Sequence, residues 1–127
     1  MKMKSISGLI YLVSDLEATK KFYESLGFII RKEMPGVSAT AYLNWFWIEF
    51  LLASKVVSEE LLPDATVNPK GIGQYTHISV EDVDAFYEVL VQKGIKPIAE
   101  PQDRPWGHRE FVISDPDGYK LVFFKKK

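Results

Sequence analysis

An internal repeat is the sequence feature that most constrains how this chain can fold. Residues 13–28 read VSDLEATKKFYESLGF, and residues 80–95 read VEDVDAFYEVLVQKGI. When residue 13 is aligned with residue 80, identical residues fall in register: Val13 with Val80, Asp15 with Asp82, Ala18 with Ala85, and Gly27 with Gly94. Two copies are too few for a solenoid, so we expect them to pack as the two halves of one domain.

Each copy begins as a strand followed by a helix. Residues 7–13 and 75–80 are short, apolar and rich in β-formers, which predicts strands. Ser14 and Glu17 have the spacing of a capping box at the start of the first helix. Gly27 and Gly94 suit the left-handed residue that follows a helix end. Turns are predicted at Asn44–Trp45 and at 115–118, and three further strands follow each helix: 28–34, 38–43 and 46–53, then 96–101, 109–114 and 119–124.

The predicted element order is therefore β-α-β-β-β, twice. This order indicates an α+β fold of two βαβββ modules, whose curved mixed sheets surround a cavity and carry their helices on the outer face. We expect a single domain, 1–127, with module 1 at about 5–54, a linker at about 55–72 and module 2 at about 73–127. The whole stretch that joins the copies, 54–74, contains two prolines and two glycines and reads as loop, with one helical turn near 58–62.

Composition excludes several classes of protein. The chain has 127 residues, of which 46% are hydrophobic and 26% charged, as in one soluble globular domain. Its net charge of -1 creates no overall field that would attract nucleic acid or an anionic membrane. There is no cysteine, which excludes disulfides and thiolate nucleophiles and suits the cytoplasm. No apolar stretch approaches the roughly 18 residues of a membrane span.

The stretches DLEATKKFYESLGF and PWGHREFVISDPDGYKLVFF give the chain a family resemblance. With the repeat, they resemble the vicinal oxygen chelate superfamily, which includes glyoxalase I, extradiol dioxygenases and the bleomycin-resistance proteins. The late stretch is most similar to the bleomycin-resistance branch, whose members confer antibiotic resistance. The resemblance implies paired βαβββ modules, a homodimer, and small-molecule pockets lined by the concave face of the sheets.

The resemblance also implies where a divalent metal would bind in the enzymes of the superfamily. Those positions correspond here to Gly8, Tyr75, Val122 and a residue near Glu49. Only Glu49 is a good ligand for a divalent ion, and such ions need several fixed nitrogen or oxygen ligands. His77 shares a strand face with Tyr75 and would be the second ligand if a metal bound. We therefore predict no metal cofactor, with a divalent metal on Glu49 and His77 as the alternative.

Several aromatic and titratable side chains are predicted to line a ligand pocket. Large flat side chains with a polar tip suit such a wall, although the same residues are also common in cores. Residues 108–111 leave two alternatives open, because a one-residue slip in register reverses which side of this strand faces the pocket. The exposed Arg–Glu pair is the simpler interpretation of that segment. The predicted ligand-binding residues are Trp45, Trp47, Glu49, Tyr75, His77, Trp106 and His108.

These observations favour a binding protein over an enzyme. No G-x-S-x-G, H-E-x-x-H, P-loop or G-x-G-x-x-G motif occurs, and we predict no catalytic residue. The predicted function is metal-free sequestration of an amphipathic aromatic or cationic small molecule. The alternative is a metal-dependent lyase, isomerase or dioxygenase of the glyoxalase type. A third alternative is a protein-interaction module whose own side chains fill the cavity.

Overall fold

The computed structural model describes residues 1–127, which form two compact units, Met1–Asn68 (unit 1) and Pro69–Lys127 (unit 2). Each unit contains one predicted βαβββ module. The boundary lies inside the predicted linker, and the single-domain arrangement around a shared cavity stays a prediction. None of the helices is long and apolar enough to cross a lipid bilayer.

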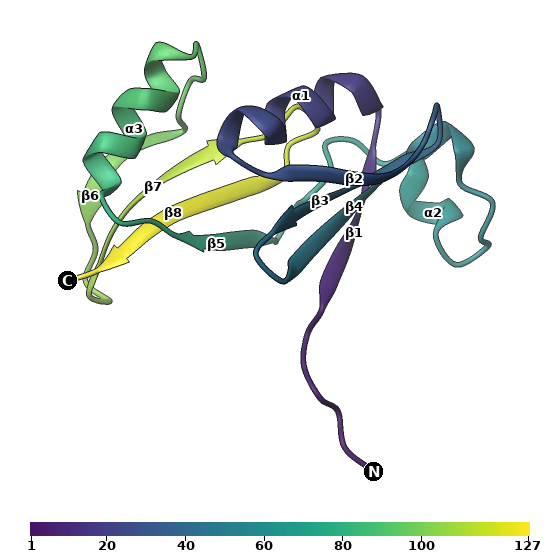
Figure 1. Ribbon diagram of the computed structural model, residues 1–127, viewed down its shortest axis with the longest axis horizontal. Helices are drawn as coiled ribbons and strands as arrows, with labels where there is room; N and C mark the ends of the chain where they lie inside the picture. Colours follow the sequence, from purple (N-terminus) through teal and green to yellow (C-terminus); the bar gives the residue numbers. More distant parts are fainter. The chain divides into compact units, whose positions relative to one another are not determined.

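Unit 1 is a four-stranded mixed sheet with one long helix packed on it (Figure 1). The strand order is β1-β4-β3-β2, with β1 parallel to β4 and the other pairs antiparallel. Its elements are β1 (Gly8–Val13), α1 (Leu16–Leu26), β2 (Ile29–Met34), β3 (Ser38–Leu43), β4 (Phe46–Leu52), η1 (Ala53–Lys55) and α2 (Leu62–Ala65).

Unit 2 repeats this design with the order β5-β8-β7-β6, in which β5 is parallel to β8 (Figure 1). Its elements are β5 (Tyr75–Ser79), α3 (Val83–Gln92), β6 (Ala99–Asp103), β7 (His108–Ser114) and β8 (Lys120–Lys126). The repeat, the α+β class and the mixed sheets are therefore confirmed.

One face of each sheet packs against a helix through aromatic side chains. In unit 1, the ring of Tyr23 on α1 lies 4.7 Å from that of Phe50 on β4. In unit 2, Phe86 on α3 lies 4.8 Å from Phe123 on β8, and Tyr87 lies 5.3 Å from Phe111 on β7. Because strand side chains alternate between faces, the residues on either side of Phe50, Phe111 and Phe123 belong to the opposite, helix-free face.

Three sequence-based boundaries were wrong. The first helix is capped by Asp15, not Ser14: the Asp15 carboxylate accepts a hydrogen bond from the Ala18 amide at 3.0 Å. Strand β6 runs from Ala99 to Asp103 instead of 96–101, because its pairing with β7 continues to the tight turn at 104–107. In the linker, the short helix lies at Leu62–Ala65, later than 58–62.

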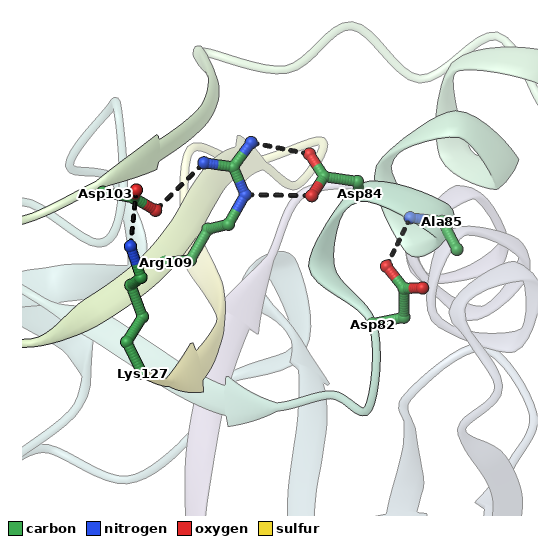
Figure 2. A network of polar contacts seen from close by, with 6 residues as sticks. All are labelled: Asp82, Asp84, Ala85, Asp103, Arg109 and Lys127. Carbon is green, nitrogen blue, oxygen red and sulfur yellow. Dashed lines mark hydrogen bonds and ion pairs between the residues drawn. The ribbon is translucent and has the colours of Figure 1, made fainter.

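An ion-pair network joins the start of α3 to the part of the β6–β7 hairpin next to its turn (Figure 2). Arg109 donates two hydrogen bonds to Asp84, at 2.8 and 2.9 Å, and a third to Asp103 at 3.0 Å. Lys127 also binds Asp103, at 2.6 Å. The hydrogen bonds from Arg109 lower the pKa of Asp84. The pKa of Asp103 is lowered mainly by its hydrogen bond from Lys127 and further by the one from Arg109.

The helix cap in unit 2 should contribute measurably to stability. Asp82 accepts a hydrogen bond from the Ala85 amide at 3.0 Å (Figure 2). We expect Asp82→Ala to lower the free energy of unfolding by about 1 kcal/mol, because it leaves that amide without its partner. Urea unfolding followed by circular dichroism measures the change. Glu81→Ala removes an exposed neighbouring acid that caps nothing, and an equal loss in both variants would contradict the assignment.

The network predicts a pH-dependent contribution to stability. Both aspartates have a pKa below the ordinary 3.8, so they bind fewer protons in the folded than in the unfolded chain. Their contribution is present above about pH 4 and is lost as the pH falls through their lowered values. Arg109→Gln should therefore lower the melting temperature at pH 7. The difference in melting temperature between this variant and the native chain should become smaller as the pH falls towards 3. Arg31→Gln, an exposed arginine of β2, should show no such pH dependence.

Candidate functional site

The helix-free face of unit 1 carries two of the predicted binding residues. Trp47 and Glu49 alternate with the buried Ile48 and Phe50 on β4, so both point away from α1. Register places Trp47 opposite Gly8 on β1 and Tyr42 on β3. Trp47 and Glu49 therefore lie together on the helix-free face of the unit 1 sheet.

The indole of Trp47 lies directly on the backbone of Gly8. A Cβ atom built on Gly8 would fall inside the van der Waals envelope of three ring carbons, Cδ2, Cε2 and Cε3. Only glycine leaves room for the ring in this position. The indole therefore occupies the space into which a side chain at position 8 would extend.

Glu49 is partly exposed on this face, between Ile10 on β1 and Thr40 on β3. Its carboxylate has no hydrogen-bonding or ionic partner within the chain. A carboxylate among aromatic and aliphatic neighbours that keeps access to solvent is free to accept a hydrogen bond from, or pair with, a bound molecule.

The helix-free face of unit 2 brings the two histidines together. His77 on β5 and His108 on β7 have ring centroids 6.5 Å apart, and both contact Phe124 on β8. His108 stacks on Phe124 at 4.5 Å with an interplanar angle of 19°. The open question about residues 108–111 is thereby answered: His108 and Glu110 share the helix-free face, and Arg109 and Phe111 lie on the helix side.

Glu110 is the centre of a polar cluster that the sequence did not identify. Its side chain is only 6% exposed and accepts a hydrogen bond from Trp106 Nε1 at 2.9 Å. The oxygen that accepts this bond, Glu110 Oε1, also lies 3.8 Å from His108 Nδ1. The second carboxylate oxygen, Oε2, lies 4.0 Å from Arg104 Nε. The Arg104 guanidinium also lies over the Trp106 ring, 5.8 Å from its centroid. The alternation of residues on both sides of the 104–107 turn was the signal that would have revealed this cluster.

The remaining predicted residues are more exposed. Trp106 is 60% exposed despite its hydrogen bond to Glu110, so much of its indole remains open. Tyr75 is 56% exposed, with the Lys120 ammonium 5.7 Å from its ring centroid. Trp45 is 71% exposed at the β3–β4 turn, where its ring lies 5.6 Å from that of Phe46.

The donor set does not fit a divalent metal at the positions that the family resemblance gives. Gly8 has no side chain and is covered by Trp47, and Val122 is apolar and buried. Tyr75 is a poor ligand for most divalent ions, which leaves Glu49 alone. Within neither unit do three His, Asp or Glu side chains gather closely enough to share a metal ion.

Two βαβββ modules with amphipathic helix-free faces define a class of small α+β proteins built by duplication. The sequence model of the Glyoxalase/Bleomycin resistance protein/Dioxygenase superfamily matches residues 5–123. The chain therefore belongs to the Glyoxalase/Bleomycin resistance protein/Dioxygenase superfamily, as the sequence motifs indicated.

Individual relatives include enzymes. The chain is 28% identical to Metallothiol transferase FosB from Lysinibacillus sphaericus (strain C3-41), over 97% of this chain and 83% of the relative. A glyoxalase/bleomycin resistance protein/dioxygenase from Nocardioides is 25% identical in sequence, with a TM-score of 0.84 over 99% of this chain and 85% of that one. A lactoylglutathione lyase from Agrobacterium tumefaciens shares the fold, at a TM-score of 0.75, 17% identity and coverage of 98% and 95%.

The contact between Gly8 and Trp47 can be tested by a double-mutant cycle. We expect Gly8→Ala to lower the free energy of unfolding by about 1–3 kcal/mol and to change the near-ultraviolet circular dichroism, because the methyl group displaces the indole. In a Trp47→Leu background the same change should cost little, since the ring is gone. Equal costs in both backgrounds would show that the indole does not lie on Gly8.

Proposed function

We propose that this protein binds and sequesters an amphipathic aromatic small molecule on the helix-free faces of its sheets, without a metal at the family positions. The observation that carries the proposal is the Trp47 indole lying on Gly8. It places a flat aromatic surface where the family resemblance puts a metal ligand. Such surfaces bind planar ligands by stacking and by burial of apolar area.

The other exposed groups of these faces support the same function. Trp106, Tyr75 and His77 present ring surfaces to solvent in unit 2. In unit 1, the unpaired carboxylate of Glu49 would accept a hydrogen bond from a donor group of the ligand or pair with a cationic one. The proposal includes no named antibiotic, although bleomycin resistance is part of the family description.

The proposal includes a homodimeric assembly in the cytoplasm. The family resemblance supports the dimer, and the absence of cysteine is compatible with a reducing compartment. The arrangement of both modules as one domain around a cavity belongs to the same proposal.

A divalent-metal-dependent enzyme is the second candidate function. It is favoured by the likeness to a metallothiol transferase across 97% of this chain. Glu49 and His77 would be the protein ligands. With Gly8 and Val122 at two family positions, this chain supplies fewer ligands than such a site needs.

The proposed function predicts saturable binding of aromatic compounds. Titration with a set of neutral and cationic naphthalene derivatives should quench tryptophan fluorescence and raise the melting temperature, because a ligand of the folded state stabilises it. Trp47→Ala should weaken binding about tenfold or more, since a stacking surface contributes on the order of 1–2 kcal/mol. Tyr11→Phe, under α1, is the matched control. Glu49→Gln should weaken binding of the naphthylmethylammonium cation selectively.

Two results would count against this function. The first is the absence of quenching and of thermal stabilisation with every compound. The second is a stoichiometric divalent metal in protein purified without chelator, lost in both Glu49→Ala and His77→Ala. The second result would establish the metal-dependent alternative.

A further inference from the structure

The tight turn between β6 and β7 aligns three basic side chains in a row on unit 2. The Arg104 amide donates to the His108 carbonyl at 2.7 Å, which places these residues opposite each other across the hairpin. On the next strand, Lys126 pairs with His108 in the β7–β8 register. Directly opposed residues of an antiparallel sheet share a face, so Arg104, His108 and Lys126 all belong to the helix-free face.

Arg104 differs from the other arginine of the same hairpin. Arg109, on the helix side, has three hydrogen bonds to Asp84 and Asp103. The Arg104 side chain makes no hydrogen bond within the chain, and its Nε atom is buried without a partner. Its nearest charged group is Glu110, at 4.0 Å. A guanidinium presents five donors in a planar fork, and those of Arg104 remain unused.

The charges on this face do not balance. Arg104, Lys120 and Lys126 are cationic, and Glu110 is the one acid that the strand registers place with them. Glu110 is largely buried and directs one oxygen to the Trp106 indole. The chain as a whole carries a net charge of -1, so this positive face is a local feature. Such a face attracts a negatively charged group.

We infer that Arg104 is the anion-binding residue of the helix-free face of unit 2, and that the ligand is an aromatic carboxylate or a similar planar oxyanion. The guanidinium fork matches the two oxygens of a carboxylate. The Trp106 indole next to it, open over much of its surface, would contact the aromatic body of the same molecule. This inference rests on the proposed binding function and specifies the class of ligand.

Two compounds that share an aromatic body and differ in charge test the inference. We expect the native chain to bind 2-naphthoate at least about tenfold more tightly than 2-naphthalenemethanol at low ionic strength, because charge-assisted hydrogen bonds are the stronger ones. The preference should shrink as salt is added. Calorimetry gives the affinities. The Nε1–H signal of Trp106, assigned with Trp106→Phe, should shift on binding of naphthoate.

Substitutions in the hairpin distinguish the effect of Arg104 on naphthoate binding from the effects of its neighbours. Arg104→Gln should abolish the preference for naphthoate and leave the binding of the alcohol unchanged, whereas Arg104→Lys should retain part of it. Arg109→Gln, on the opposite sheet face, should retain all of it. Glu110→Gln keeps an acceptor for the Trp106 N–H and removes the one acid, so it should strengthen naphthoate binding.

The outcomes distinguish the inference from the function on which it rests. Equal affinity of the native chain for the two compounds, or an unchanged preference in Arg104→Gln, overturns the role of Arg104 and leaves the proposed function standing. Weaker naphthoate binding in Glu110→Gln also overturns it. No binding of either compound overturns both proposals.

Discussion

The packing of one helix on one face of each sheet is the interaction on which the rest of the structure depends. Tyr23 packs against Phe50, and Phe86 packs against Phe123. The fully buried rings of Tyr23, Phe50 and Phe123 each contribute on the order of 1.5–3 kcal/mol. Because side chains alternate along a strand, this burial also decides what the opposite face presents. Trp47 and the polar cluster around Glu110 are on the helix-free faces because their neighbours in sequence are held under the helices.

Most of the fold followed from the sequence, and the exceptions depend on backbone geometry and strand register. The element order followed from apolar strands and from two repeated helices, each followed by a glycine, Gly27 or Gly94. These signals depend only on neighbouring residues. Ser14 and Asp15 are both good caps, and only the backbone geometry selects Asp15. The end of β6 and the face of β7 depend on the register of the hairpin, which the alternating sequence around 108–111 leaves ambiguous by one residue.

The candidate site shows the same division between local and tertiary information. The alternation of side chains along a strand placed Tyr75 on the same face as His77, and the structure agrees. The sequence also revealed glycine at a family ligand position, but it did not reveal that an indole fills the space above it. Glu110 was the larger omission. It resembled half of an exposed ion pair with Arg109, whereas the sheet separates the two residues and buries the carboxylate beside Trp106.

Net charge is a poor guide to the ligand of such a protein. A net charge of -1 excludes a strong overall electrostatic field, and the lone carboxylate of Glu49 favours a cationic ligand. Strand alternation redistributes the charges, however, so that Arg109 is neutralised by two aspartates on the helix side while Arg104 is left on the other. Two arginines of one hairpin therefore have different surroundings, because they lie on opposite faces of the same sheet: Arg109 is held by ion pairs, and Arg104 Nε has no hydrogen-bond partner. The electrostatic preference of a binding face follows from the residues that the register places together, and the sum over the chain conceals it.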